Sequence, residues 1–93
     1  FMAVSRDNKS LYAINAPTFG GKDPEQVAAY QLEGRTGRLK LLNTQSTHGT
    51  ASCYLDVDAT GRMVVVANYS TGNVASFPVQ PDGSLGPAAS VIQ

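Results

Sequence analysis

The feature that most constrains this chain is an internal repeat of a strand-rich pattern. Residues 2–15 align with residues 55–68, so that Asn15 lies over Asn68, 53 positions later. Residues 27–32 align with residues 74–79, which follow 47 positions later. The spacing changes only between apolar runs, where a longer turn costs little, whereas packing fixes the register within a strand. The sequence therefore predicts two consecutive copies of one supersecondary unit.

Each copy is predicted to form four antiparallel strands. Leu55 and Val57 alternate with polar side chains, which is typical of a pleated strand. Residues 63–67 are apolar on both faces, as expected of a strand that lies between two sheets. In the second copy the expected strands are 53–58, 62–68, 74–79 and a short outer strand from Ser84, the counterpart of 38–42. No ten-residue segment holds a helical apolar period, so the fold class is predicted to be all-β.

Two tandem four-stranded units of this length indicate neighbouring blades of a β-propeller. We expect residues 1–47 to form one blade with a truncated first strand, and residues 48–93 to form the next. Two blades cannot close a ring, and the chain starts on Phe1 inside a strand-like run, so we expect a fragment of a longer chain. The alternative is a free-standing small β-sandwich. It is disfavoured because each apolar second strand needs a neighbouring sheet on both faces.

Charge and cysteine content argue against several classes of partner. Seven basic and seven acidic residues balance without a run of either sign, so neither nucleic acid nor an anionic membrane is an expected partner. Cys53 is the only cysteine, which excludes an internal disulfide and a Cys-Cys metal site, and we expect no metal and no cofactor. A reducing, cytoplasmic location fits this usage. No signal-peptide layout and no apolar stretch of membrane-spanning length is visible.

Propeller topology assigns the connections to two faces. Loops from the second strand to the third, and from the fourth strand to the next blade, emerge on one rim. We therefore expect residues 15–26, 46–50 and 68–73 to share a face, where binding groups usually sit. The turns at 7–8, 59–61 and 80–83 are expected on the far side.

Four side chains on the predicted rim are candidates for substrate contacts: Asn15, His48, Asn68 and Tyr69. His48 is the only side chain here that titrates near neutrality, although a single loop histidine is also ordinary surface. Asn68 and Tyr69 end a buried strand, where an amide and a phenol can bind substrate hydroxyls or satisfy backbone groups of the loop. Both interpretations stay open from the sequence.

Two acidic residues and the cysteine have simpler structural explanations. Asp56 and Asp58 share a strand face and could mimic a catalytic pair, but turn capping explains Asp58, and solvation or a hydrogen bond explains Asp56. Cys53 has no basic group nearby in sequence and is expected to be a small packing residue. A structural role is therefore favoured over a catalytic one for each of these three residues.

The second copy also resembles a known family. Its stretch Gly49-Thr-Ala-Ser-Cys-Tyr-Leu-Asp-Val-Asp-Ala-Thr-Gly-Arg-Met-Val-Val-Val-Ala-Asn-Tyr69, followed by Gly72-Asn-Val74, Pro78 and Asp82-Gly-Ser-Leu85, is similar to the seven-bladed β-propeller lactonases. These are of the 6-phosphogluconolactonase type and are related to a carboxymuconate-lactonizing enzyme. Residues 11–15 and 36–39 of the first copy follow the same pattern. Ser52 departs from it, since the family usually has proline there.

The resemblance implies a seven-bladed parent that hydrolyses a sugar lactone to the open acid. In such chemistry a general base assists the attack of water, and cationic groups hold the phosphate and the oxyanion. The family's histidine, arginine and glutamate come mostly from later blades, so we expect this segment alone to be inactive. Two alternatives remain for the parent. It could be a non-catalytic propeller that serves as a binding scaffold, or a muconate-lactone cycloisomerase-like enzyme.

Overall fold

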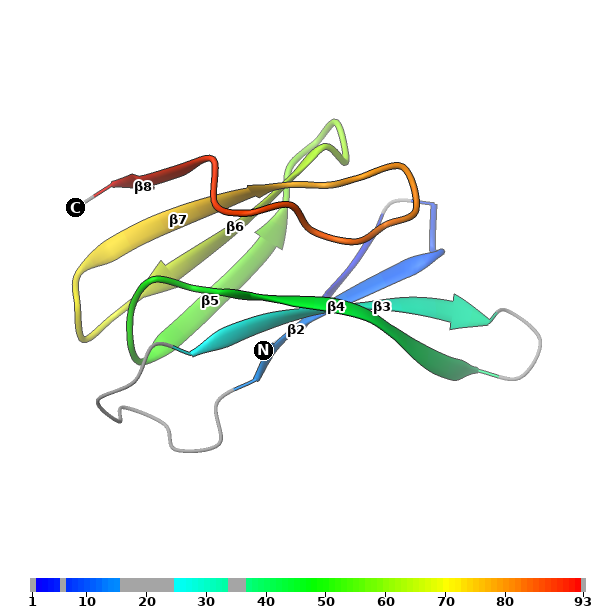
Figure 1. Ribbon diagram of the computed structural model, residues 1–93, viewed down its shortest axis with the longest axis horizontal. Helices are drawn as coiled ribbons and strands as arrows, with labels where there is room; N and C mark the ends of the chain where they lie inside the picture. The colour runs from blue at the N-terminus through cyan, green and yellow to red at the C-terminus, as the bar shows by residue number, and fades with distance from the viewer. Residues whose placement is uncertain (1, 6, 16–24, 34–36, 93) are drawn as a thin grey trace.

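The computed structural model describes residues 2–5, 7–15, 25–33 and 37–92, and of Asn15 and Cys53 it describes the backbone alone. This part of the chain forms two four-stranded antiparallel sheets, each with its strands in sequence order (Figure 1). The first sheet contains β1 (Met2–Val4), β2 (Ser10–Asn15), β3 (Gln26–Glu33) and β4 (Arg38–Ser46). The second contains β5 (Ser52–Val57), β6 (Met63–Asn68), β7 (Asn73–Pro78) and β8 (Ser90–Ile92). The predicted all-β class with two four-stranded units is confirmed.

The register of the strands follows the repeat in the sequence. Asn15 at the end of β2 pairs with Gln26, and its equivalent Asn68 at the end of β6 pairs with Asn73. Both pairs close the connection from the second strand to the third. The central hairpins of the two sheets are therefore the same unit, as the alignment predicts.

One apolar core fills the space between the sheets. It consists of Tyr12, Val27, Ala29, Leu55, Val64, Val66, Ala75, Phe77 and Leu85. Alternate residues of β3, β6 and β7 point into it because successive side chains of a strand face opposite ways. This core accounts for the burial of Val64 and Val66 in the apolar run of β6.

The sheets stack in the same sense, so equivalent residues of the two copies face different neighbours. Val27 of the first sheet is fully buried against the second, whereas its equivalent Val74 lies on the open face of the second sheet and is 40% exposed. Conversely, Leu39 on the open face of the first sheet is 50% exposed, whereas its equivalent Leu85 is fully buried between the sheets. A head-to-tail contact of this kind leaves one face of each sheet open to a further unit. The arrangement argues against a self-contained sandwich.

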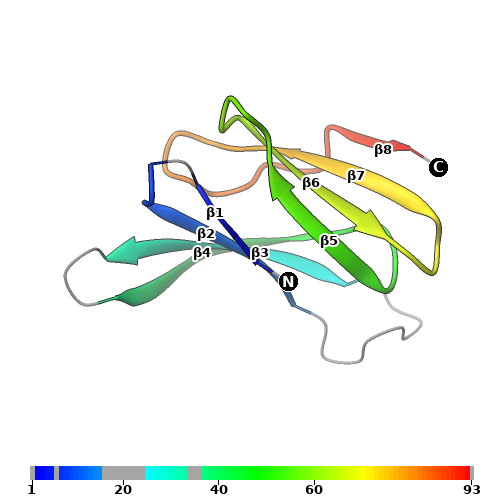
Figure 2. The same ribbon diagram turned by 180° about the vertical axis from the view of Figure 1, so that it is seen from behind.

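The outer strand of the second unit is not where the sequence analysis placed it. We expected it to start at Ser84, but β8 covers Ser90–Ile92, and Leu85 makes only an isolated bridge to Val79. The N–H and carbonyl of Leu85 instead bond to the side-chain amide of Asn43 on β4, at 3.0 and 2.7 Å. The Asn43 carboxamide thus pairs with the backbone N–H and carbonyl that Leu85 would otherwise offer to a neighbouring strand. Figure 2 shows this segment crossing between the sheets before β8 begins.

Asp58 caps the turn between β5 and β6, as the sequence suggested. Its carboxylate accepts hydrogen bonds from the Thr60 hydroxyl at 3.0 Å and from the Arg62 N–H at 3.0 Å. Desolvation is the largest single influence and raises the pKa of Asp58. The hydrogen bonds from Thr60, Met63, Arg62 and Gly61 together outweigh it and leave the pKa below its ordinary value. The second residue of the supposed acidic pair, Asp56, accepts from the Tyr54 hydroxyl at 3.2 Å.

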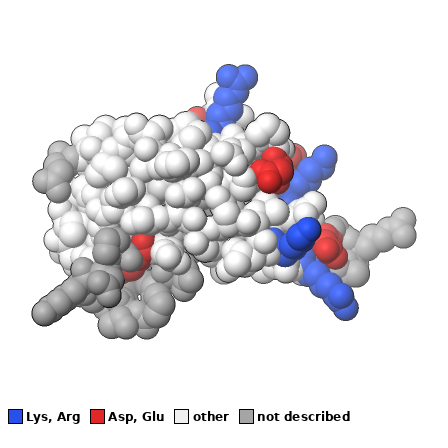
Figure 3. All heavy atoms as spheres, in the orientation of Figure 1, with Lys and Arg blue, Asp and Glu red and all other residues white. Residues whose placement is uncertain are grey.

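The described residues contain no helix long and apolar enough to cross a membrane. Charged side chains of both signs adjoin one another toward one end of the molecule, and the broad surface between the ends is uncharged on the visible face (Figure 3).

Candidate functional site

Two loops meet at one end of the stacked sheets and form the candidate site. We call residues 46–51, between β4 and β5, and residues 68–73, between β6 and β7, the rim loops. The N–H of Tyr69 donates to the carbonyl of Ala51 at 2.9 Å, and the N–H of Ser70 donates to that of Thr50 at 3.2 Å. Both loops lie at the end opposite the turns 7–9 and 58–62 (Figures 1 and 2). The predicted sharing of one face is confirmed for these loops, and residues 16–24 lie outside the described residues.

A buried hydrogen-bond network lies under the rim loops and joins the two sheets. Asn68 is 2% exposed, and its Nδ2 donates to the carbonyl of Thr47 at 2.9 Å. Its Oδ1 accepts from the hydroxyl of Ser52 at 2.6 Å. The Thr47 hydroxyl in turn donates to the carbonyl of Gly49 at 3.0 Å. Because every buried polar group costs free energy unless it is paired, this network sets one conformation for both loops.

A second set of contacts joins the tips of the rim loops. Asn73 Nδ2 donates to the carbonyl of His48 at 3.0 Å, and the Thr71 hydroxyl donates to Asn73 Oδ1 at 2.5 Å. A Cβ placed on Gly49 would lie 2.6 Å from the Cβ of Asn68 and would also collide with Thr71. The close approach of the two loops therefore requires glycine at position 49.

The four predicted site residues have different surroundings. Tyr69 is 71% exposed, and His48 is exposed on a backbone with φ of 60°. Asn68 is buried, and both polar atoms of its amide are engaged in the network below the loops. Asn15 ends β2 at the same end of the sheets, but its side chain lies outside the described residues. The structure thus exposes the phenol of Tyr69 and the imidazole of His48 to solvent. The amide of Asn68 lies below them and binds the loop backbone.

Glu25 is the residue that sequence reasoning missed. It directly precedes β3 and is 3% exposed. Its two carboxylate oxygens accept from the N–H groups of Ala51 at 2.8 Å and Ser52 at 2.9 Å. A charged residue directly before an apolar strand was the only signal in the sequence, and no pattern indicates partners that lie 26 and 27 positions later.

The chemistry that the rim loops offer is neutral hydrogen bonding. Neither loop contains lysine or arginine. Ser52 is 1% exposed and donates its hydroxyl proton to Asn68, so it is not positioned as a nucleophile. Among the residues that the structure describes, no group of three or more His, Cys, Asp or Glu side chains could hold a metal ion. These loops suit the binding of hydroxyl groups, and the phenol of Tyr69 and the imidazole of His48 are exposed there together with the hydroxyl side chains of Ser70 and Thr71.

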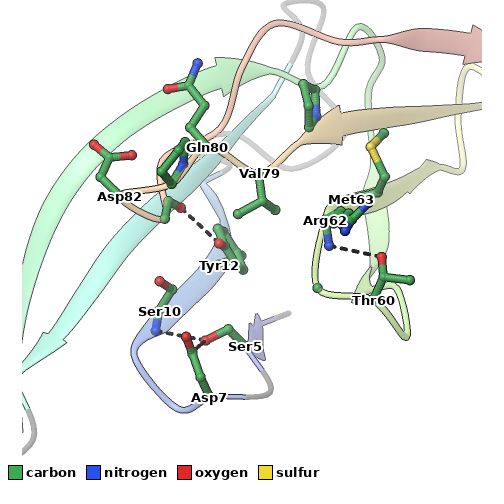
Figure 4. A pocket seen from close by; sticks show the side chains of 14 residues that line it. Ser5, Asp7, Ser10, Tyr12, Thr60, Arg62, Met63, Val79, Gln80 and Asp82 are labelled. Carbon is green, nitrogen blue, oxygen red and sulfur yellow. Dashed lines mark hydrogen bonds between the residues drawn. The ribbon is translucent and has the colours of Figure 1, made fainter.

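A hollow of about 690 Å³ lies at the opposite end, between the turns of the two sheets (Figure 4). On one side the Tyr12 hydroxyl donates to the carbonyl of Gly83 at 2.9 Å, and burial raises the pKa of this phenol. Hydrogen bonds from the Ser84 hydroxyl and N–H lower the pKa of Asp82. Hydrogen bonds from the Ser5 hydroxyl and a backbone N–H likewise lower the pKa of Asp7. The carboxylates of Asp7 and Asp82 thus accept hydrogen bonds from residues of their own turns. These turns lie on the face where propeller topology places the short hairpin connections.

Comparison with known proteins matches the whole chain to one family model. The model is described as "Lactonase, 7-bladed beta-propeller" and covers residues 1–93. A protein of Bacillus subtilis named 6-phosphogluconolactonase is 42% identical over 86 residues, which are 91% of this chain and 23% of that protein.

Solved structures agree in sequence and in shape. A structure from Bacteroides fragilis, provisionally described as a 6-phosphogluconolactonase, is 39% identical with a TM-score of 0.86, over 99% of this chain and 24% of the other. A periplasmic gluconolactonase of Pseudomonas aeruginosa is 29% identical with a TM-score of 0.83, over 97% of this chain and 26% of the other. The chain thus spans about a quarter of the length of the relatives that it matches.

Proposed function

This chain belongs to the seven-bladed β-propeller lactonase family, and from this premise we propose that the full-length protein hydrolyses 6-phosphogluconolactone to the open acid. The observation that carries the proposal is the 42% identity to the Bacillus subtilis 6-phosphogluconolactonase across 91% of this chain. The chain corresponds to a quarter of such a protein, so the activity belongs to the whole propeller.

We propose that residues 1–47 and 48–93 are two consecutive blades whose other partners are the remaining blades of the same chain. Support comes from the apolar side chains on the outward faces. Met2 is 68% exposed and Leu41 55% exposed on the first sheet, and Tyr54 is 55% exposed and Ile92 64% exposed on the second. Neighbouring blades would remove these surfaces from water, and each Å² of apolar area buried contributes about 25 cal/mol.

This chain contributes one side of the rim at which the substrate binds. We assign His48 and Tyr69 to contacts with the sugar lactone, because both side chains are exposed on the rim loops. Asn68 acts beneath them through the loop backbone, and Asn15 belongs to the same rim at the equivalent position of the first copy. The general base and the cations that bind the phosphate are expected from other blades. The isolated 93-residue chain is accordingly expected to be inactive.

The test is hydrolysis of 6-phosphogluconolactone by the full-length protein, measured above the spontaneous rate. Glucono-lactone without phosphate serves as the second substrate, because the Pseudomonas aeruginosa relative is a periplasmic gluconolactonase. Faster hydrolysis of the phosphorylated lactone supports the proposal, and preference for the unphosphorylated one assigns the protein to that relative's substrate. No acceleration of either at micromolar enzyme refutes a lactonase and favours a propeller that serves as a binding scaffold.

We further propose that the full-length protein acts in the cytoplasm, where phosphorylated sugars are metabolised. The single Cys53, without an internal disulfide partner, is compatible with a reducing compartment. Cell fractionation decides the point, and recovery of the protein in the periplasm would contradict it.

A further inference from the structure

The carboxylate of Glu25 fixes the loop that starts the second blade. Glu25 directly precedes β3, an interior strand of the first sheet, yet both of its carboxylate oxygens accept hydrogen bonds from the N–H groups of Ala51 and Ser52 in the second unit. The backbone of Glu25 adds two bonds to the same loop, since its N–H donates to the carbonyl of Gly49 at 3.1 Å and its carbonyl accepts from the N–H of Thr47 at 2.8 Å. Hydrogen bonds to an ionised acceptor are about twice as strong as neutral ones. One buried residue therefore makes three hydrogen bonds to the loop 46–51 and a fourth to Ser52, the first residue of β5.

The loop that Glu25 holds contains backbone conformations that L-residues rarely adopt. His48 has φ of 60° and Ala51 has φ of 52°. In this left-handed region a Cβ crowds the neighbouring carbonyl, and alanine has no polar side chain to offset the cost locally. Such conformations persist where surrounding contacts impose them, and they cluster at functional sites. The bond from the Ala51 N–H to Glu25 is one of those contacts.

Ala51 also connects Glu25 to the second rim loop, residues 68–73. The carbonyl of Ala51 accepts from the N–H of Tyr69, so the peptide groups on either side of Ala51 link the Glu25 carboxylate to the exposed phenol. The carbonyl of His48 is held by Asn73 in the same loop. Displacing Ala51 would therefore disturb the loops that carry His48 and Tyr69.

We propose that Glu25 is a positioning residue for substrate binding, which acts through the strained loop to place His48 and Tyr69 at the rim. This inference rests on the proposed function, because the substrate is the sugar lactone of that proposal. Glu25 itself is 3% exposed and is not assigned a contact with the substrate.

The test compares Glu25→Gln with the matched control Glu33→Gln in the full-length protein. Glu33 is an exposed glutamate at the other end of β3. Glutamine offers one acceptor oxygen, and its amide donors oppose the second N–H, so the bidentate contact is lost. Hydrogen exchange of the Ala51 and Ser52 amides is expected to accelerate at least about tenfold in Glu25→Gln and to stay unchanged in Glu33→Gln. KM for the lactone is expected to rise about tenfold while kcat changes less than about twofold, since the catalytic groups lie in other blades.

Two further variants keep the test decisive. Ala51→Gly removes the steric cost of the left-handed conformation, so in the Glu25→Gln background it should reverse part of the rise in KM. A fold defect unrelated to this residue would not be rescued. Should Glu25→Gln fail to fold, Glu25→Asp keeps the charge, shortens the reach by one methylene and is expected to change exchange and KM in the same directions.

Each contrary result has its own meaning. Unchanged exchange of the two amides in Glu25→Gln would overturn the role of the carboxylate in holding the loop. Accelerated exchange with unchanged KM, or a loss confined to kcat, would overturn its role in substrate binding. A wild-type protein that fails to accelerate lactone hydrolysis overturns the proposed function and the substrate side of this inference, while the exchange experiment still decides whether Glu25 holds the loop.

Discussion

Replacing Asn68 with alanine in the full-length protein tests the network beneath the rim loops. The side chain is 2% exposed and makes two buried bonds, to the Thr47 carbonyl at 2.9 Å and from the Ser52 hydroxyl at 2.6 Å. Alanine leaves that carbonyl and that hydroxyl without this partner, at about 1–3 kcal/mol each. The Ser52 hydroxyl lies 3.2 Å from the Thr47 hydroxyl and can turn toward it. We therefore expect a loss of about 2–4 kcal/mol in the free energy of unfolding.

A double-mutant cycle with Ser52→Ala separates the hydrogen bond from loss of packing. Ser52→Ala removes one of the groups that Asn68→Ala leaves unpaired, so the double variant should cost about 1–2 kcal/mol less than the sum of the single ones. Urea unfolding followed by circular dichroism supplies the free energies, provided that the dependence on urea has the same slope in all four proteins. Tyr69→Phe, at an exposed neighbouring position, serves as control and should stay within about 0.5 kcal/mol of wild type.

Additive losses of stability in the double-mutant cycle would refute this prediction. If the two single losses sum to the double loss within about 0.5 kcal/mol, the side chains of Asn68 and Ser52 are not coupled. A loss below about 1 kcal/mol for Asn68→Ala alone would show that the amide is not a buried bridge between the two sheets.

Three more predictions follow from the same contacts, each measured by urea unfolding of the full-length protein. Gly49→Ala should cost about 1–3 kcal/mol because its Cβ would lie 2.6 Å from the Cβ of Asn68, which is held by two hydrogen bonds; an unchanged stability would contradict the close approach. Phe77→Ala should cost about 3–5 kcal/mol because this ring is fully buried between the sheets, and a loss below about 1 kcal/mol would place it outside the core. The pKa of Asp82 is lowered in the fold by bonds from Ser84, so its stabilisation is present above the unfolded pKa near 3.8 and is lost as pH falls through the folded value. Asp82→Asn should therefore lose less stability than wild type on acidification through this range, and equal losses would contradict the assignment.

The strands were predictable because their signals are local. Alternation in β5, the apolar run of β6 and the aligned turns each reflect the neighbours of a residue along the chain. The repeat strengthened these signals, since two copies independently give the same pattern. The rim loops could also be placed, because an antiparallel unit sends alternate connections to opposite ends.

The prediction failed where a tertiary contact replaced a local one. Residues after Ser84 resemble an outer strand, and their alignment with the first copy supports that interpretation. Yet the backbone of Leu85 bonds to the side chain of Asn43 in the other sheet, and its own side chain enters the core. A partner 42 positions away leaves no trace in the local pattern.

What the sequence alone determined is the repeated unit, its strand periodicity and its resemblance to the propeller lactonases. Only the tertiary structure decided which polar groups are available at the rim. Asn68 and Tyr69 are adjacent in sequence and looked equivalent, yet one is 2% and the other 71% exposed. The role of Glu25 was likewise hidden, because a carboxylate becomes a structural acceptor only when folding brings two amides from the next unit to within 2.9 Å of it. Strand formation depends on neighbours in the chain, whereas burial and pairing of polar groups depend on neighbours in space.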